Sequence, residues 1–355
     1  QPLFDRYDYF WFMGIYKESE ASRQHAQKWS FQSRYALPDL DPNKDVAASP
    51  FAIPEYSPNT LIAKNWESWD EVLDYLHQNN KKVIIDFVPN HLALDCELAK
   101  THPQYFIQGN QAQYQANPDF YYPISSSDEK TYYLAHGKDP NFPPWADTLQ
   151  LNYAIPEVHR YMSDVLQNLS LHSDGLRCDM AMLLDPGTFL RTWGWTLSDE
   201  EKKYLSEHSF WEENIPLIKK NVNNHFKFIG EVYWDQDYLS QYFDYLYDDR
   251  FYKGVIRPSP DFKNHLYELL DSGHVNNSNC RQALYIENHD EERAIKTLGE
   301  KRAKAAAFLA ATIPKTMFIV NQGQENGWKI RPPMQINRFP PESDNPQIKA
   351  FYQKL

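Results

Sequence analysis

Short apolar runs recur along this chain and alternate with amphipathic stretches. Helical spacing of apolar residues marks several stretches between the runs, among them residues 68–78, 156–169, 211–221 and 292–311. Eight runs have the length and composition of strands, and they cover residues 9–15, 51–53, 83–88, 175–179, 226–232, 243–247, 283–287 and 316–320. This alternation is typical of βα units, and eight strands predict a (β/α)8 barrel, also called a TIM barrel.

One connection is too long for a βα loop. Roughly 80 residues separate His91 from His172, whereas such loops usually have about 2–6. Residues 93–147 are rich in Tyr, Pro, Asn and Gln and have little helical periodicity. We therefore predict a small insertion domain after the third strand, at residues 92–150. Residues 1–91 and 151–355 would form the barrel.

Composition excludes several classes of protein. The net charge of −12 repels phosphate backbones, which argues against a nucleic-acid partner. No apolar stretch approaches the ~20 residues that cross a bilayer, so no membrane partner is expected. The three cysteines, Cys96, Cys178 and Cys280, form no CxxC pair, which disfavours a zinc ribbon or a disulfide scaffold. Unpaired cysteines favour the cytoplasm. No feature indicates an oligomeric state.

The segment GLRCDMA, residues 175–181, places an arginine two residues before an aspartate at the end of a predicted strand. Side chains alternate across a strand, so Arg177 and Asp179 share one face while Cys178 points to the other. An adjacent cation favours the ionised form of a carboxyl group. Asp179 is therefore a candidate nucleophile.

The segment VIIDFVPNH, residues 83–91, contains one carboxylate within an apolar strand. A buried aspartate is costly without a partner, and Arg177 is a natural one. We expect Asp86 to be structural and to hold Arg177. His91 lies at the strand end, where barrel active sites lie, although a loop histidine with a structural role would look the same.

Two later segments also end apolar runs with polar residues. They are GEVYW, residues 230–234, and IENHD, residues 286–290. Glu231 is placed where a carboxyl group can stay protonated and act as an acid, while His289 and Asp290 would point to the same end of the barrel. Taken singly, each could be a strand-end or helix cap.

Together these carboxylates indicate glycoside cleavage. Asp179, Glu231 and Asp290 end three different predicted strands, and catalytic residues of a barrel come from several strand ends. Glycoside cleavage needs one ionised and one protonated carboxyl group. The set is far more specific than its members.

In order along the chain, DFVPNH, GLRCDMA, GEVYW and IENHD resemble the signature segments of the α-amylase superfamily, glycoside hydrolase family 13. The resemblance implies a retaining glycoside hydrolase that cleaves α-glucosidic bonds in oligo- or polysaccharides. Asp179 would form a covalent glycosyl intermediate, Glu231 would be the acid/base, and Asp290 would stabilise the transition state. The residues implied to hold the glucosyl unit are Arg177, His91, His289 and Phe51, the last where the family usually has a tyrosine.

The chain departs from the family at several places. Met182 and Leu183 stand where many relatives have Lys-His. The sequence therefore does not indicate whether water or a second sugar accepts the glycosyl unit. Asn90 matches a family calcium ligand, but residues 148–152 lack the usual aspartate. We therefore expect no required cofactor, with calcium at Asn90 possible. The chain starts with Gln1 rather than Met and ends without the family's C-terminal β-sandwich, which predicts a fragment or a reduced member.

Three alternatives remain open from the sequence. A transglycosylase on α-glucans would use the same residues and differ only in the acceptor. A catalytically inactive amylase-like barrel would serve as a binding module, because fold alone does not prove chemistry. A metal-dependent lyase would use the carboxylates as ligands, but Arg177 would compete with its cation.

Overall fold

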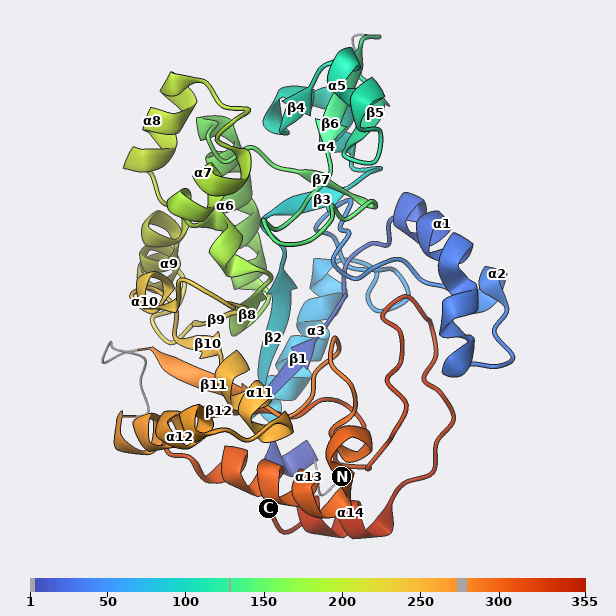
Figure 1. Ribbon diagram of the computed structural model, residues 1–355, viewed down its shortest axis with the longest axis vertical. Coiled ribbons are helices and arrows are strands. Elements are labelled where there is room, and N and C mark those ends of the chain that lie inside the picture. The colour runs from blue at the N-terminus through green and yellow to red at the C-terminus, as the bar shows by residue number, and fades with distance from the viewer. Residues whose placement is uncertain (1–3, 128, 273–279) are drawn as a thin grey trace. The chain divides into compact units, whose positions relative to one another are not determined.

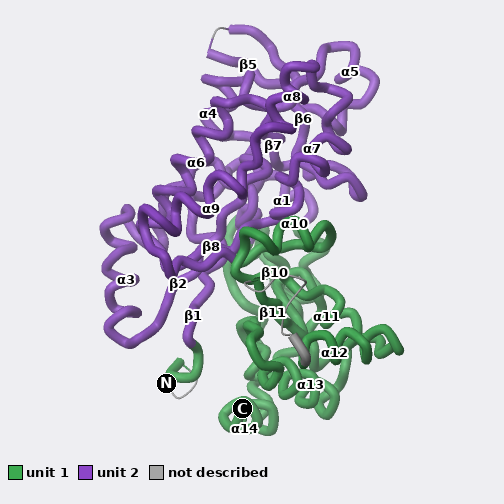
Figure 2. Tube along the Cα trace, turned by 90° about the vertical axis from the view of Figure 1, so that its left-hand side faces the viewer, with its two compact units in different colours: residues 1–7, 30–45, 229–355 green, residues 8–29, 46–228 purple. Residues whose placement is uncertain are grey.

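A computed structural model describes residues 4–127, 129–272 and 280–355 (Figure 1). The chain divides into two compact units, coloured separately in Figure 2. Unit 1 comprises Gln1–Tyr7, Ser30–Asp45 and Ile229–Leu355, and unit 2 comprises Asp8–Trp29 and Val46–Phe228.

Unit 2 contains three parallel strands, β1 (Tyr9–Phe12), β2 (Lys82–Phe87) and β8 (Gly175–Cys178). All residues of β2 after Lys82 are buried, as expected for a parallel strand with covered faces. The register between β2 and β8 sets Asp86 directly beside Arg177. Two charged side chains thus enter a buried sheet as neighbours.

The longer helices of unit 2, Trp66–Gln78, Pro156–Leu171 and Phe210–Asn221, each bury several apolar side chains. In α3 (Trp66–Gln78), Asn65 caps the N-terminus by accepting from the Ser68 N–H, and the helix packs on β2. A capping box of Ser198 and Glu201 begins α8 (Asp199–Glu207). The helices are α1 (Glu20–Trp29), α3 (Trp66–Gln78), α6 (Pro156–Leu171), α7 (Pro186–Trp193), α8 (Asp199–Glu207) and α9 (Phe210–Asn221).

The proposed insertion, residues 92–150, folds mainly as short antiparallel strands. The antiparallel strands β3 (His91–Ala93) and β7 (Thr148–Gln150) pair His91 with Gln150. A three-stranded sheet has the order β4 (Gln108–Gly109), β6 (Thr131–Ala135), β5 (Tyr121–Ser125). The elements are β3 (His91–Ala93), α4 (Glu97–Thr101), β4 (Gln108–Gly109), α5 (Gln111–Ala116), β5 (Tyr121–Ser125), β6 (Thr131–Ala135) and β7 (Thr148–Gln150).

Unit 1 contains the later parallel strands, β9 (Lys227–Gly230, of which the last two residues belong to the unit), β10 (Tyr245–Tyr247), β11 (Arg281–Tyr285) and β12 (Met317–Ile319). Its core includes Leu284, Ile286 and Ala307. Gly299 interrupts α13 with a φ of 73°. The helices are α2 (Pro42–Asp45), α10 (Gln236–Leu239), α11 (Asp249–Ile256), α12 (Pro260–Ser272), α13 (Ala294–Thr312) and α14 (Pro346–Tyr352).

Seven of the eight predicted strands form, and the eighth prediction, at residues 51–53, is wrong. There the chain makes a turn in which the Ala52 N–H donates to the Ser49 carbonyl. Pro50 and Pro54 flank the segment, and a proline has no N–H to donate to a ladder. The Ile53 carbonyl accepts from the Ala93 N–H of β3 at 3.0 Å.

Two further findings concern the whole described chain. Within residues 4–127, 129–272 and 280–355, no helix is both long and apolar enough to cross a membrane. Cys96, Cys178 and Cys280 are each buried.

Candidate active site

Asp179 and Arg177 meet at the carboxyl end of β8, in unit 2. Arg177 Nη1 donates to Asp179 Oδ1 at 2.6 Å and lies 3.6 Å from Asp86 Oδ1. All three side chains are buried, and Asp86 is fully so. A guanidinium this close stabilises the ionised form of both carboxyl groups, because the opposite charge offsets the cost of desolvation.

Aromatic rings enclose the guanidinium. Its carbon lies 5.3 Å from the centre of the Trp11 ring and 5.1 Å from that of Phe51, within range of cation–π attraction. Trp11 Nε1 also donates to Asp86 Oδ1 at 3.2 Å, and the Gly14 N–H donates to Asp86 Oδ2 at 3.3 Å. Asp86 therefore ties the end of β1 to Arg177.

His91 is buried at the start of β3, also in unit 2. Its Nδ1 lies 3.3 Å from Asn90 Nδ2, and its Nε2 lies 3.2 Å from the Phe51 carbonyl oxygen. Burial lowers the pKa of His91 to about 4, so the ring is neutral near neutral pH. Because Asn90 Nδ2 can only donate, Nδ1 accepts and Nε2 carries the proton.

Glu231 follows β9 and belongs to unit 1. It is buried, and the Tyr233 hydroxyl donates to its Oε1 at 3.0 Å. Burial, followed by the charge of Glu231, raises the pKa of Tyr233 well above its usual value. The hydroxyl therefore keeps its proton and can orient the Glu231 carboxyl group.

His289 and Asp290 follow β11 in the same unit. His289 Nε2 lies 3.0 Å from Asp290 Oδ2, and the Asp290 side chain is 41% exposed. Asn288 Oδ1 accepts from the N–H groups of Asp290 and Glu291, both at 2.9 Å. Arg331 also donates to the Asp290 carbonyl. Backbone contacts on two sides fix this turn.

Within unit 2 the structure therefore brings together Asp86, Arg177, Asp179 and Phe51, with His91 contacting Phe51. Within unit 1 it joins His289 to Asp290 and Tyr233 to the buried Glu231. Sequence reasoning missed Trp11 and Tyr233. Tyr233 lies two residues after Glu231, a spacing that puts both side chains on one face of an extended segment. Their contact could therefore have been predicted from the sequence.

The residue after Asp179 has an unusual backbone. Met180 has φ 42° and ψ 45°, the left-handed region that non-glycine residues seldom adopt. It leads into a short 3-10 helix, Ala181–Leu184, in which Met182 and Leu183 are buried. Both side chains are thus apolar contacts of the protein interior.

The residues around Asn90 do not fit a calcium ion. Gln150 Nε2 donates to Asn90 Oδ1 and to the Asn90 carbonyl oxygen, both at 3.0 Å. An amide NH₂ group cannot ligate a cation, whereas Ca²⁺ prefers six to eight oxygens with carboxylates among them. In the described part of the chain, no three His, Cys, Asp or Glu side chains are grouped closely enough to hold a metal.

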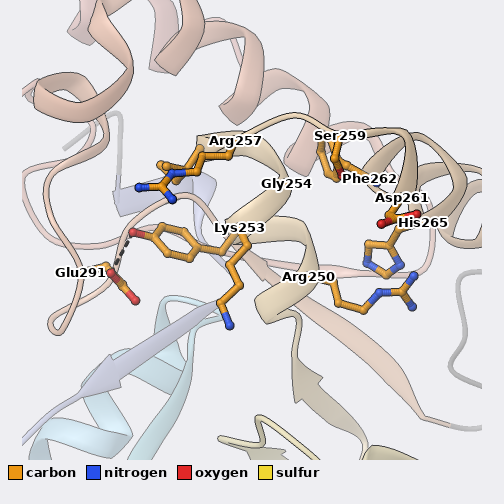
Figure 3. A pocket seen from close by; sticks show the side chains of 11 residues that line it. Arg250, Lys253, Gly254, Arg257, Ser259, Asp261, Phe262, His265 and Glu291 are labelled. Carbon is orange, nitrogen blue, oxygen red and sulfur yellow. Dashed lines mark hydrogen bonds between the residues drawn. The ribbon is translucent and has the colours of Figure 1, made fainter.

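A cavity of about 600 Å³ lies beside α11 and α12 in unit 1 (Figure 3). In this view Glu291 and Arg257 lie at one side, and Arg250 and His265 lie at the other. Two of its cations have acidic neighbours, since Lys253 pairs with Asp249 at 2.5 Å and Arg250 with Glu268 at 3.2 Å. The lining residues are Arg250, Tyr252, Lys253, Gly254, Ile256, Arg257, Ser259, Asp261, Phe262, His265 and Glu291. These mixed charges favour neither an anion nor a cation.

Comparison with known proteins identifies relatives. The family model described as "Alpha amylase, catalytic domain" matches residues 64–339. The α-amylase MalA of Haloarcula japonica is 26% identical over 269 residues, which are 74% of this chain and 34% of that protein. The cyclomaltodextrin glucanotransferase of Geobacillus stearothermophilus is 22% identical over 266 residues, 72% of this chain and 35% of that protein.

A solved structure agrees in fold. The crystal structure of an α-amylase from Lactobacillus plantarum superposes on this chain with a TM-score of 0.63 and 20% sequence identity. The match covers all of this chain and 81% of that one. The present chain spans about a third of the length of the two curated relatives named above.

Proposed function

Because the chain belongs to the α-amylase catalytic-domain family, whose fold is a (β/α)8 barrel, we propose that it is a retaining glycoside hydrolase acting on α-glucosidic bonds of oligo- or polysaccharides. The observation that carries the proposal is the buried contact of 2.6 Å between Arg177 and Asp179. This contact holds a carboxylate ionised at the end of a barrel strand, as a nucleophile requires.

In the proposed first step, an Asp179 oxygen forms a bond to the anomeric carbon as the bond from that carbon to the glycosidic oxygen breaks. Glu231 gives its proton to the departing oxygen. In the second step Glu231, now ionised, takes a proton from water. The hydroxyl oxygen bonds to the anomeric carbon and the Asp179 carboxylate departs. Two inversions give net retention.

The remaining candidate residues would bind and orient the sugar. Asp290, partly exposed beside His289, would face the positive charge that develops on the ring. His91 is neutral, so it would act through hydrogen bonding rather than charge. The Phe51 ring, held against Arg177, would stack on a sugar face.

Two other functions remain candidates. Transfer to a second sugar would use the same intermediate, and one relative is named a cyclomaltodextrin glucanotransferase. The buried, apolar Met182 and Leu183 offer no charge to select the acceptor. A binding module without catalysis would need no ionised carboxylate, so the Arg177–Asp179 pair weighs against it.

The test is incubation with maltooligosaccharides of several lengths, with products and anomeric configuration followed by NMR. We expect α-configured products that are shorter than the substrate. Asp179→Asn and Glu231→Gln should each lower kcat by several orders of magnitude, since each removes a group that acts in the transition state. The exposed Asp199→Asn serves as the matched control and should retain full turnover.

Each outcome separates the candidates. Products longer than the substrate, increasing with added maltose, would indicate a transglycosylase. Binding without turnover of any α-glucoside would support the binding module. Wild-type turnover by Asp179→Asn would refute the assignment of the nucleophile. We predict a separation of ~5–5.5 Å between the Asp179 and Glu231 carboxyl groups in a crystal structure, and ~9 Å would contradict a retaining mechanism.

A further inference from the structure

One amide group lies at a point where three oxygens converge. Gln150 Nε2 donates to the Asn90 carbonyl oxygen at 3.0 Å, to Asn90 Oδ1 at 3.0 Å and to the Leu151 carbonyl oxygen at 3.1 Å. The Gln150 and Asn90 side chains are both buried. Three buried oxygens around one centre would repel one another unless something positive lay between them.

The N–H groups of the Gln150 amide carry partial positive charge, although the amide as a whole is neutral. Its two N–H bonds are shared among the three oxygens, and its own Oε1 accepts from Asn90 Nδ2 at 3.2 Å. The pairing is reciprocal, so turning either amide around would set like atoms against each other. Asn90 Nδ2 also reaches His91 Nδ1 at 3.3 Å. The Gln150 amide therefore orients the Asn90 amide, and the Asn90 amide in turn orients the His91 ring.

The backbone places this group at a junction of two parts of unit 2. Antiparallel pairing sets Gln150 opposite His91. The Leu151 N–H donates to the Asn90 carbonyl at 3.2 Å, and the Ile107 N–H donates to the Gln150 carbonyl at 3.0 Å. The segment after β2 and the last strand of residues 92–150 therefore meet at this amide pair.

We infer that the Gln150 amide takes the place of a bound cation, closing this junction and orienting Asn90 and His91 without a metal. A cation would need the same three oxygens that the N–H groups already occupy, and it would meet the NH₂ group instead of a ligand. The inference stands on the amide geometry and does not depend on the glycosidase proposal.

Gln150→Glu tests this, because it replaces the NH₂ group with an oxygen of nearly the same size. Four oxygens then converge, and the ionised carboxylate is tolerated only with a cation. Without added cation, we expect a Tm lower than wild type by roughly 3–8 °C near pH 8, and a smaller deficit near pH 5 where the carboxyl group regains a proton. Millimolar CaCl₂ should restore the Tm near pH 8.

Two variants serve as controls. Gln167→Glu makes the same change at an exposed position of α6 and should show neither the deficit nor a calcium effect. Gln150→Met removes the donors without adding a ligand, so it should lower the Tm and calcium should not restore it. This contrast separates cation binding from general stabilisation by salt.

The wild-type protein provides a test that needs no variant to fold. Its Tm should be the same in EDTA and in CaCl₂, and elemental analysis after dialysis should find far less than one calcium per chain. A wild-type Tm that falls in EDTA and recovers in CaCl₂ would overturn the inference. So would a folded Gln150→Glu protein as stable as wild type near pH 8, or one that neither Ca²⁺, Mg²⁺ nor Mn²⁺ restores.

Discussion

Replacing Asp86 with Asn tests whether the buried aspartate holds Arg177 and the end of β1. The substitution keeps the size of the side chain but removes its charge and one acceptor. The Asn oxygen can accept from either Trp11 Nε1 or the Gly14 N–H, which now meet different ends of the carboxylate. The other N–H would face an NH₂ group.

The structure sets the size of the effect. Leaving one buried donor without an acceptor costs about 1–3 kcal/mol. Removing the carboxylate that lies 3.6 Å from the Arg177 guanidinium also lowers the free energy of unfolding. This second loss is small because Asp179 still pairs with Arg177. We take about 3 kcal/mol in total. For 355 residues, an unfolding entropy of ~2.1 cal/mol/K per residue converts this into a Tm lowered by about 4 °C.

Differential scanning calorimetry of wild type and Asp86→Asn at equal protein concentration measures this shift. Asp199→Asn is the matched control, because its side chain is fully exposed and lies 3.8 Å from Lys202. It should change the Tm by less than about 1 °C. If Asp86→Asn lowers the Tm no more than the control does, the buried carboxylate does not hold Arg177 as argued.

Three further predictions concern pH and binding. Tyr233→Phe removes a hydrogen-bond donor to the Glu231 carboxylate, which should raise the pKa of that group. The basic limb of the profile of kcat/KM against pH should then move up by about one pH unit. An unchanged limb would contradict the role of Tyr233. Because burial lowers the pKa of His91 to about 4, the unfolded chain binds more protons below about pH 6.5. Stability should fall by up to about 3 kcal/mol between pH 6.5 and 4, and His91→Gln should flatten that fall in urea titrations. Phe51→Tyr adds a hydroxyl beside Arg177 and should lower KM about fivefold with kcat unchanged, whereas a raised KM would argue against sugar stacking there.

The fold was predictable where burial imposes a long apolar pattern. β2 and β8 are continuous buried runs, and the sequence marks them clearly because parallel strands have no polar face. The turn at residues 51–53 has the same local composition but lies between two prolines. The small sheets of residues 92–150 gave no periodic signal, because their strands have two to five residues.

The candidate site was predictable from residue types at strand ends, but its supporting contacts were not. Asp86 and Arg177 could be paired from charge and burial alone. The part played by Gln150 depends on a register between β3 and β7 that no sequence spacing specifies. Trp11 contacts Asp86 across 75 positions of the chain, which local patterns do not report.

The left-handed backbone of Met180 constrains position 180 differently from the residues that follow it, and substitution data can reveal this difference. Glycine adopts such a φ without strain and asparagine does so more readily than most residues. The following residues, Ala181–Leu184, are all buried. In a saturation library selected for folding, position 180 should therefore enrich glycine and asparagine, while positions 181–184 should accept only apolar side chains. The neighbours of Asp179 would then be constrained by chain geometry and packing, independently of any chemistry on a sugar.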